Sequence, residues 1–351
     1  EISCSLVGSE MCIRDRFTMQ TQRQLVDLSE NKAIMNIDVL SFKRLAYRVF
    51  DELGITNLTV LEETGKNLVL RKLAAQEADK LGVIGRNLNR IGYISEVKSL
   101  LSELVQYNIS PEELGRYIAS GRLSDTLSDK LKDVLVLYEA FEKFMQDKYI
   151  TAEEILNVLS NVAEESAILR NSVIAFDEFT GFTPIQNQLI KKLFVISKKI
   201  YVTLTIDCRE DIFKSRGMQE LFDMPKRTVK SLTEMAAFYG IEVEEPIILD
   251  KNYRLAENEE LSFMEQQLFR KRRCSFKKAP KHIHIDCLRD QKQELTKIAR
   301  RINELVRNEN LRYRDIAIVT GDVNIYAGYV REIFDKYNIP YFIDALSLIH
   351  I

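Results

Sequence analysis

The stretch SVIAFDEFTGFTPIQ, at residues 172–186, determines the fold class that the sequence predicts. Its first part, SVIAF, is a continuous apolar run between polar residues, which is typical of a buried parallel strand. The spacing of apolar residues in PIQNQLIKKLFVIS (184–197) predicts a helix, and KKIYVTLTID (198–207) predicts a second buried strand. The order strand, helix, strand predicts an α/β fold with a parallel sheet and right-handed crossovers.

Two acids, Asp177 and Glu178, directly follow the first of these strands. They are therefore expected at the carboxyl edge of the sheet, where ligands bind in open α/β folds. In nucleotide hydrolases the first acid holds Mg²⁺ through water, and the second can activate the attacking water. Strand-end acids often only cap the next helix, however, and this motif alone does not separate the two interpretations.

The composition is that of an ordinary globular protein. The 351 residues suffice for two or three domains, and 46% of them are hydrophobic. The formal net charge of -2 means that any contact with DNA must come from local patches. No run of 18 apolar residues predicts a membrane span. The five scattered cysteines form no CxxC pair, which argues against a disulfide framework or a zinc site and suits a reducing cytoplasm.

The periodicity divides the chain into four parts. Residues 17–60 and 166–269 alternate between strand and helix, and residues 61–165 are almost wholly helical, which predicts a helical insertion. Within the insertion, Ser110 is expected to cap a helix that starts at Pro111. In residues 270–345, the segments 282–288, 315–322 and 339–344 predict strands with helices between them, so a second α/β domain is expected to start there.

The two ends have a different character. Residues 1–16 (EISCSLVGSEMCIRDR) and 346–351 resemble translated sequencing-adapter read-through, and they are predicted to be non-native and left out of the fold. The alternative is a native terminus without order. If the ends are foreign, the remaining residues are expected to be an internal piece of a longer protein.

The motif around the two acids resembles superfamily 1 helicases of the UvrD type. Those proteins carry DEFQD followed by a Gln nine residues after the first Asp, and Asp177, Glu178 and Gln186 keep that spacing. Thr180 and Gly181 depart from the pattern. The tail FTGFTPIQ is specifically similar to the AddB subunits of the bacterial AddAB helicase-nuclease. The resemblance implies a P-loop helicase-type (RecA-like) parallel sheet with a large helical insertion and the start of a second RecA-like domain.

Other segments resemble helicase motifs in the family's order. IDCREDIFKSRG (206–217) is similar to the stretch GDPKQSIYRFRG, with Glu210 in place of the Gln that couples nucleotide to DNA, and LDKNYR (249–254) is similar to the motif whose Arg reaches the γ-phosphate. The segments FTMQTQRQLV and VLSFKRLAYRVF are similar to motifs near single-stranded DNA. Thr320 and Gly321 stand where an Arg is usual.

The resemblance assigns roles position by position. The implied catalytic residues are Glu178 and Arg254. The implied nucleotide-binding residues are Asp177, which would also hold the metal ion, Gln186 and Asp207. The implied DNA-binding residues are Phe17, Thr18, Ser41, Phe42 and Arg216.

The implied cofactors are ATP and Mg²⁺, but GxxxxGK[ST] is absent from the sequence, so the nucleotide site is expected to be incomplete here. An iron-sulfur cluster is expected only in a carboxy-terminal region that this sequence lacks, because Cys208, Cys274 and Cys287 do not have cluster spacing. This stretch alone should therefore neither hydrolyse ATP nor cut DNA. The implied partners are an AddA-type subunit and single- and double-stranded DNA, with no membrane.

Two functions stay open. In the first, the full protein is a subunit of a helicase-exonuclease that processes DNA double-strand breaks for recombinational repair. In the second, this region is a helicase-like scaffold without motor activity that recognises a recombination hotspot sequence. An unrelated α/β protein is the third alternative.

Overall fold

The computed structural model describes residues 10–13, 18–83, 85, 91–121, 123–145, 149–269 and 274–343. The chain forms two compact units, Glu1–Asp250 and Lys251–Ile351, and each is described by itself. The division falls before residue 270, where the sequence predicts the second domain to start.

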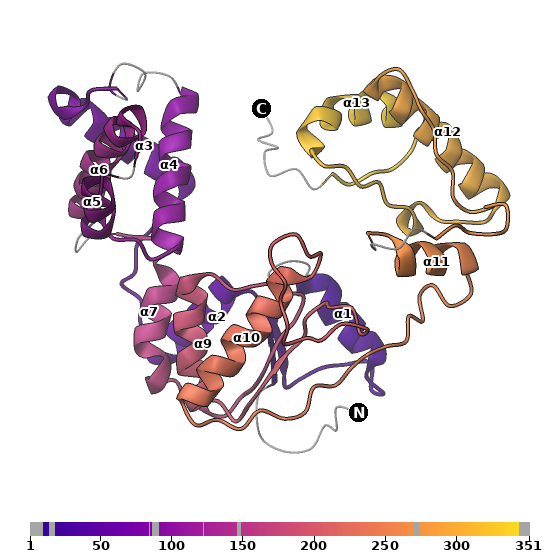
Figure 1. The fold of residues 1–351 in the computed structure, drawn as a ribbon, viewed down its shortest axis with the longest axis horizontal. Coiled ribbons are helices and arrows are strands. Elements are labelled where there is room, and N and C mark those ends of the chain that lie inside the picture. Colours follow the sequence, from indigo (N-terminus) through magenta and orange to yellow (C-terminus); the bar gives the residue numbers. More distant parts are fainter. Residues whose placement is uncertain are drawn as a thin grey trace. The chain divides into compact units, whose positions relative to one another are not determined.

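The first unit is built on a four-stranded parallel sheet (Figure 1). Its strands are β1 (Glu10–Ile13), β2 (Ile37–Leu40), β5 (Val173–Phe176) and β6 (Lys199–Val202), in the order β2-β1-β5-β6. Each of the three neighbouring pairs is parallel. The predicted α/β class with a parallel sheet is thus confirmed, and both strands of the segment that determined it, β5 and β6, lie side by side.

Strand β1 corrects one expectation. The sequence predicts that residues 1–16 lie outside the fold, yet Glu10–Ile13 pairs with β2 on one side and β5 on the other. The short segment EMCI has too little periodicity to be recognised as a strand, but Met11 and Ile13 are fully buried in the core. Whether residues 1–16 are native stays a prediction.

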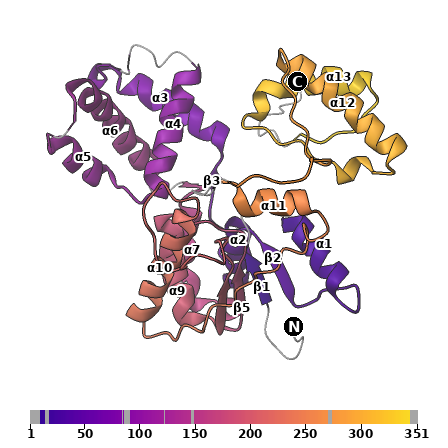
Figure 2. The same cartoon turned by 45° about the vertical axis from the view of Figure 1, so that its right-hand side comes forward.

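Helices surround the sheet (Figures 1 and 2). The apolar faces of several helices and the buried strands share one core, which includes Leu45, Leu159, Phe176 and Leu189. Helix α2 begins after its N-cap Ser41 and ends at Gly54, which has a φ of 68°. The elements of this region are α1 (Thr18–Leu28), α2 (Phe42–Leu53), α7 (Ile155–Val162), η3 (Ala163–Glu165), α8 (Ala167–Arg170), α9 (Pro184–Ile196) and α10 (Asp223–Phe238).

The predicted helical insertion has a hydrophobic core of its own, which includes Leu70, Ile94, Leu137 and Phe141. As expected, Ser110 caps a helix, because its hydroxyl accepts from the backbone N–H of Glu113 at 3.3 Å. The elements are α3 (Glu63–Gln76), η1 (Ala78–Lys80), α4 (Ile91–Gln106), α5 (Pro111–Ala119) and α6 (Asp125–Met145).

The chain enters and leaves the insertion through two adjacent short strands. Strand β3 (Val60–Leu61) precedes α3, and β4 (Ile150–Thr151) follows α6. The two strands pair in parallel, so they form a neck that joins the insertion to the rest of the first unit. We refer to this β3–β4 pair as the neck.

The second unit contains helices but no strand pairs among its described residues. Helices α12 (Gln291–Asn308) and α13 (Val323–Lys336) confirm the predicted helices and share a small core. The three predicted strands are wrong as strands, because residues 282–288, 315–322 and the described part of 339–344 pair with no neighbour. A strand requires ladder hydrogen bonds to a partner, and apolar composition alone does not supply one. The other elements are α11 (Glu259–Gln267) and η4 (Tyr313–Asp315).

Among the residues that the structure describes, no helix is both long and apolar enough to cross a membrane.

Candidate functional site at the carboxyl edge of the sheet

Asp177 lies at the carboxyl edge of the sheet, as the sequence predicts. Its backbone N–H donates to the carbonyl of Ile13 at 3.0 Å, and the N–H of Thr203 donates to the carbonyl of Phe176 at 2.9 Å. These two bonds continue the ladder past the ends of β1, β5 and β6. The hydroxyl of Thr203 donates to the carboxylate of Asp177, so the acid has a partner from the neighbouring strand.

Glu178 follows in a left-handed backbone conformation, with a φ of 62°. This conformation costs a non-glycine residue roughly 1–2 kcal/mol, so the surrounding packing must hold it. The next residue, Phe179, is buried and contacts the rings of Phe42 and Phe182 at centroid distances of 5.6 and 4.9 Å. The turn therefore anchors Phe179 in the core and leaves the Glu178 side chain exposed.

Gln186 forms the capping box of α9. Its side-chain oxygen accepts from the backbone N–H of Thr183 at 2.8 Å, and its own N–H donates to the Thr183 hydroxyl at 3.4 Å. This exchange satisfies two N–H groups that helix geometry leaves without partners. The Gln186 oxygen thus serves the start of a helix, a role that its spacing from Asp177 does not reveal.

Asp207 is buried, and Arg209 neutralises its carboxylate. The guanidinium donates to both oxygens, at 3.0 Å from Nε and 3.1 Å from the second nitrogen, and the side chain of Asp207 is only 5% exposed. A bidentate pair of this kind is among the stronger charge-assisted contacts in proteins. The acid predicted to bind nucleotide is therefore paired within its own loop.

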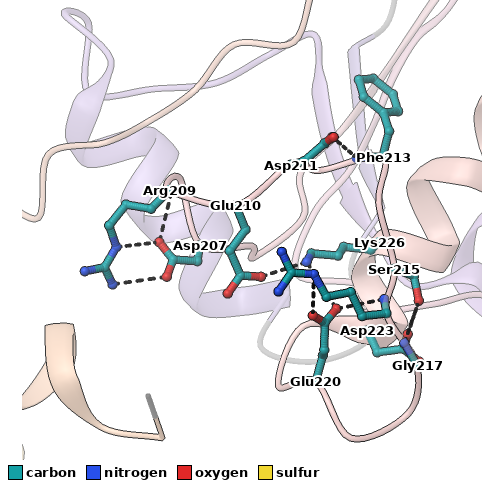
Figure 3. A network of polar contacts seen from close by, with 11 residues as sticks. Asp207, Arg209, Glu210, Asp211, Phe213, Ser215, Gly217, Glu220, Asp223 and Lys226 are labelled. Carbon is teal, nitrogen blue, oxygen red and sulfur yellow. Dashed lines mark hydrogen bonds and ion pairs between the residues drawn. The ribbon is translucent and has the colours of Figure 1, made fainter. Parts of the chain in front are cut away.

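A polar network organises residues 207–222, which connect β6 to α10 and which we call the edge loop (Figure 3). Lys226, on α10, is an ion-pair partner of Glu210 at 2.7 Å and of Glu220 at 3.3 Å. Glu220 also accepts from the backbone N–H of Arg216 at 3.1 Å. Glu210, which replaces a coupling Gln in the resembling helicases, thus has a buried cation as its partner.

A second branch of the network fixes the start of α10. The carboxylate of Asp223 accepts from the hydroxyl of Ser215 and pairs with Arg227 at 2.8 Å. Thr228 donates to the carbonyl of Thr180 at 2.9 Å, which ties α10 to the turn after Glu178. The edge loop and this turn are thereby held by the same helix.

The network perturbs two titrating groups. The hydrogen bond to Glu210 raises the pKa of Lys226 above its ordinary value of 10.5, burial opposes this rise, and Glu220 adds to it. The backbone N–H of Arg216 lowers the pKa of Glu220, and Lys226 contributes in the same direction. The cluster therefore favours the charged form of both groups.

Sequence reasoning missed Thr203, Arg209 and Lys226. Thr203 and Arg209 carry no motif, and their partners become apparent only when the strand ends and the edge loop are placed. Lys226 lies on the buried face of α10 with Thr228 and Leu232. A lysine on a buried face is the available signal, because such a group normally requires an acidic partner.

The residues predicted to bind DNA fall into different environments. Phe17 lies outside the described residues, and Thr18 is the half-buried first residue of α1. Ser41 caps α2 by accepting from the N–H of Arg44 at 3.4 Å. Phe42 is buried, with its ring 5.9 Å from that of Phe176, so it presents no open face to a base. Direct DNA contact by these residues stays a prediction.

The two predicted arginines also differ. Arg216 lies in the edge loop with its side chain 69% exposed, 3.7 Å from Glu220. Arg254 is exposed in a turn of the second unit, whereas Asp177 and Glu178 belong to the first. The structure thus brings Asp177 and Glu178 together at one edge and leaves the role of Arg254 a prediction.

The side chains of this edge offer limited capacity for a metal ion. Across the described part of the chain, no group of three or more His, Cys, Asp or Glu residues is arranged to hold one. Asp177 and Glu178 could contribute two carboxylates, which suits a Mg²⁺ held mainly by water and phosphate. The nucleotide itself would have to complete such a site.

The features described define a class: an α/β protein with a parallel sheet, a helical insertion and paired acids at the sheet's carboxyl edge. The family described as ADDB, N-terminal matches residues 11–265. The chain therefore belongs to this family.

Similar relatives are named as one subunit of an ATP-dependent helicase/deoxyribonuclease, the one designated B. The relative from Lachnoclostridium phytofermentans is 36% identical over 337 residues. Those from Caldanaerobacter subterraneus and Clostridium tetani are 33% and 31% identical. Each match covers 95% of this chain and 29% of the relative. The chain thus spans less than a third of the length of these relatives.

Proposed function

We propose that this chain is the helicase-like region of an AddB-type subunit and that it binds single-stranded DNA as a scaffold without acting as a motor. The observation that carries this proposal is the internal use of the predicted nucleotide-coupling side chains. Asp207 is paired with Arg209, Gln186 caps α9, and Glu210 pairs with the buried Lys226. A RecA-like ancestry would account for the sheet, and the altered neighbours would account for a lost motor.

The edge loop supports the DNA-binding part of the proposal. Phe213 and Arg216 are 54% and 69% exposed, and Lys214 is exposed between them. An exposed aromatic ring can stack on any unpaired base, and cations beside it can contact the phosphates. This combination suits single-stranded DNA, whose bases are accessible.

The whole protein would extend this role. The name of the relatives supports a subunit of an ATP-dependent helicase and deoxyribonuclease, which we take to pair with an AddA-type subunit in the cytoplasm. The complex would process double-strand breaks for recombinational repair, with this region recognising a hotspot sequence in single-stranded DNA. ATP, Mg²⁺ and an iron-sulfur cluster would belong to the complete assembly.

A nucleotide-hydrolysing motor is the second candidate function. The position of Asp177 and Glu178 at the carboxyl edge of adjacent parallel strands favours it, because nucleotides bind at that edge. In that case Asp177 would hold Mg²⁺ through water, Glu178 would activate the attacking water, and Arg254 would contact the γ-phosphate.

A salt titration tests the proposed scaffold. The full-length protein is titrated into a fluorescent oligo-dT strand at several salt concentrations, and the affinity is measured by anisotropy. We expect the affinity to fall as salt rises, and Arg216→Ala should lower it and reduce the salt slope by about one. Arg71→Ala, which changes an exposed arginine on α3, is the control. An affinity that does not depend on salt would contradict phosphate contacts.

A further inference from the structure

The edge loop has a charged core. Residues 207–222 contain neither helix nor strand, and the group buried beneath them is the ammonium of Lys226, whose side chain is 3% exposed. An ammonium group is costly to bury unless anions surround it. Glu210 and Glu220 provide them from two points of the loop, so one cation joins the two ends of the edge loop.

The same pairing sorts the charges of the loop by direction. Asp207 is neutralised by Arg209, and Glu210 and Glu220 face Lys226. Figure 3 shows these carboxylates directed toward their basic partners. The side chains of Phe213 and Arg216 remain exposed on the outside of the loop. The loop therefore keeps most of its acids inside and displays an aromatic ring and cations outside.

We propose that Lys226 is a positioning residue that, by neutralising Glu210 and Glu220, holds the edge loop in the form that binds single-stranded DNA. This inference rests on the proposed DNA-binding function. Lys226 is itself too buried to touch DNA. It acts through the loop, because the two carboxylates would otherwise lie uncompensated beneath Phe213 and Arg216 and repel phosphates.

Loss of the ammonium therefore has a defined effect on binding. Lys226→Met preserves the length of the side chain but leaves two carboxylates without their shared cation. The loop should open and its acids should become solvated near the DNA. We expect the affinity for oligo-dT to fall by about tenfold at low salt, with a shallower salt dependence because fewer phosphates are contacted.

The test uses the full-length protein and a fluorescein-labelled oligo-dT strand, titrated at several salt concentrations. Lys230→Met is the matched control, because Lys230 lies on the same helix, is 68% exposed and pairs only at 3.8 Å with Glu234. It removes the same charge without emptying the buried site. Lys230→Met should stay within about twofold of the wild-type affinity.

A rescue variant separates charge positioning from a general loss of structure. The triple variant Lys226→Met, Glu210→Gln and Glu220→Gln removes the cation together with both acids. It should recover affinity to within about threefold of the wild type, because no uncompensated carboxylate remains. If Lys226→Met does not fold, Lys226→Gln takes its place, since its amide still donates to a carboxylate but carries no charge.

The outcomes are distinct. If the wild type binds oligo-dT and Lys226→Met weakens binding no more than Lys230→Met does, the role of Lys226 is overturned while the scaffold function stands. A triple variant as weak as Lys226→Met also overturns it. If the wild type does not bind oligo-dT at any salt concentration, the scaffold function and this inference both fail.

Discussion

The molecule buries two lysines and uses them in different ways. Lys66 is 2% exposed on α3, beside the apolar core of the helical insertion, and Lys226 is 3% exposed on α10, beneath the edge loop. Lys66 donates to Glu153 at 2.7 Å, close to the neck. Lys226 instead joins two acids of one irregular loop.

The difference shows how a buried charge takes its role from its surroundings. Lys66 follows β3 closely and Glu153 follows β4, so their pair closes across the neck at the point where the chain enters and leaves the insertion. A change there should loosen a whole group of helices. A change at Lys226 should loosen only the edge loop, because regular elements and their cores lie on either side of it.

The largest effect is expected for Lys66→Ala. This change leaves Glu153 buried beside an empty space and should lower the free energy of unfolding of the insertion by about 3 kcal/mol. Hydrogen exchange of the backbone amides in α3 and α4 measures it. An effect below about 1 kcal/mol would contradict a role for Lys66 in closing the neck.

Lys226→Ala should have a smaller and more local effect. Loops with few apolar contacts open independently of the global fold. We therefore expect faster exchange in residues 207–222, with exchange in α3 and α4 unchanged. The same experiment as for Lys66→Ala measures both regions. Faster exchange in the insertion of this variant would show that the two lysines are not independent.

Acid should separate the neck from an ordinary surface contact. Burial raises the pKa of Glu153, but the hydrogen bond and charge of Lys66 outweigh it and hold that pKa below 4.5. A carboxyl whose pKa is lower in the folded state contributes stability above its unfolded pKa, and this contribution disappears as the pH falls through the folded value. Exchange in α3 should thus accelerate below about pH 4.5, and less so in Glu153→Gln.

The smallest effect is expected for Lys132→Ala, on α6 of the same insertion. Lys132 pairs with Asp129 at 2.9 Å, but the two side chains are 60% and 55% exposed. Solvent-exposed pairs contribute about 0.5 kcal/mol or less. Chemical denaturation should detect almost no change. A loss equal to that of Lys66→Ala would mean that burial is not what makes the neck pair important.

Local patterns in the sequence predict much of the first unit. The apolar run of β5, the Gly54 stop of α2 and the Ser110 cap of α5 are all found as predicted. These features depend on neighbouring residues, so the sequence contains their full explanation. The resemblance to AddB subunits is likewise confirmed by the family match over residues 11–265.

Features that depend on distant partners are harder to predict. Strand β1 is short and forms through its two neighbours, whereas the apolar run at residues 315–322 meets no strand partner in the described chain. At the candidate site, the position of Asp177 follows from the end of its strand. The pairing of Asp207 with Arg209 and of Glu210 with Lys226 depends on how the edge loop folds back.

The most direct test of the proposed scaffold is ATP hydrolysis by the full-length protein, without its partner, in the presence of single-stranded DNA. The wild type is compared with Glu178→Gln and with the control Glu165→Gln, which changes an exposed acid away from the sheet edge. If the predicted nucleotide site is not a motor, the three proteins should hydrolyse ATP at the same basal rate. A DNA-stimulated rate that falls tenfold or more only in Glu178→Gln would contradict the account.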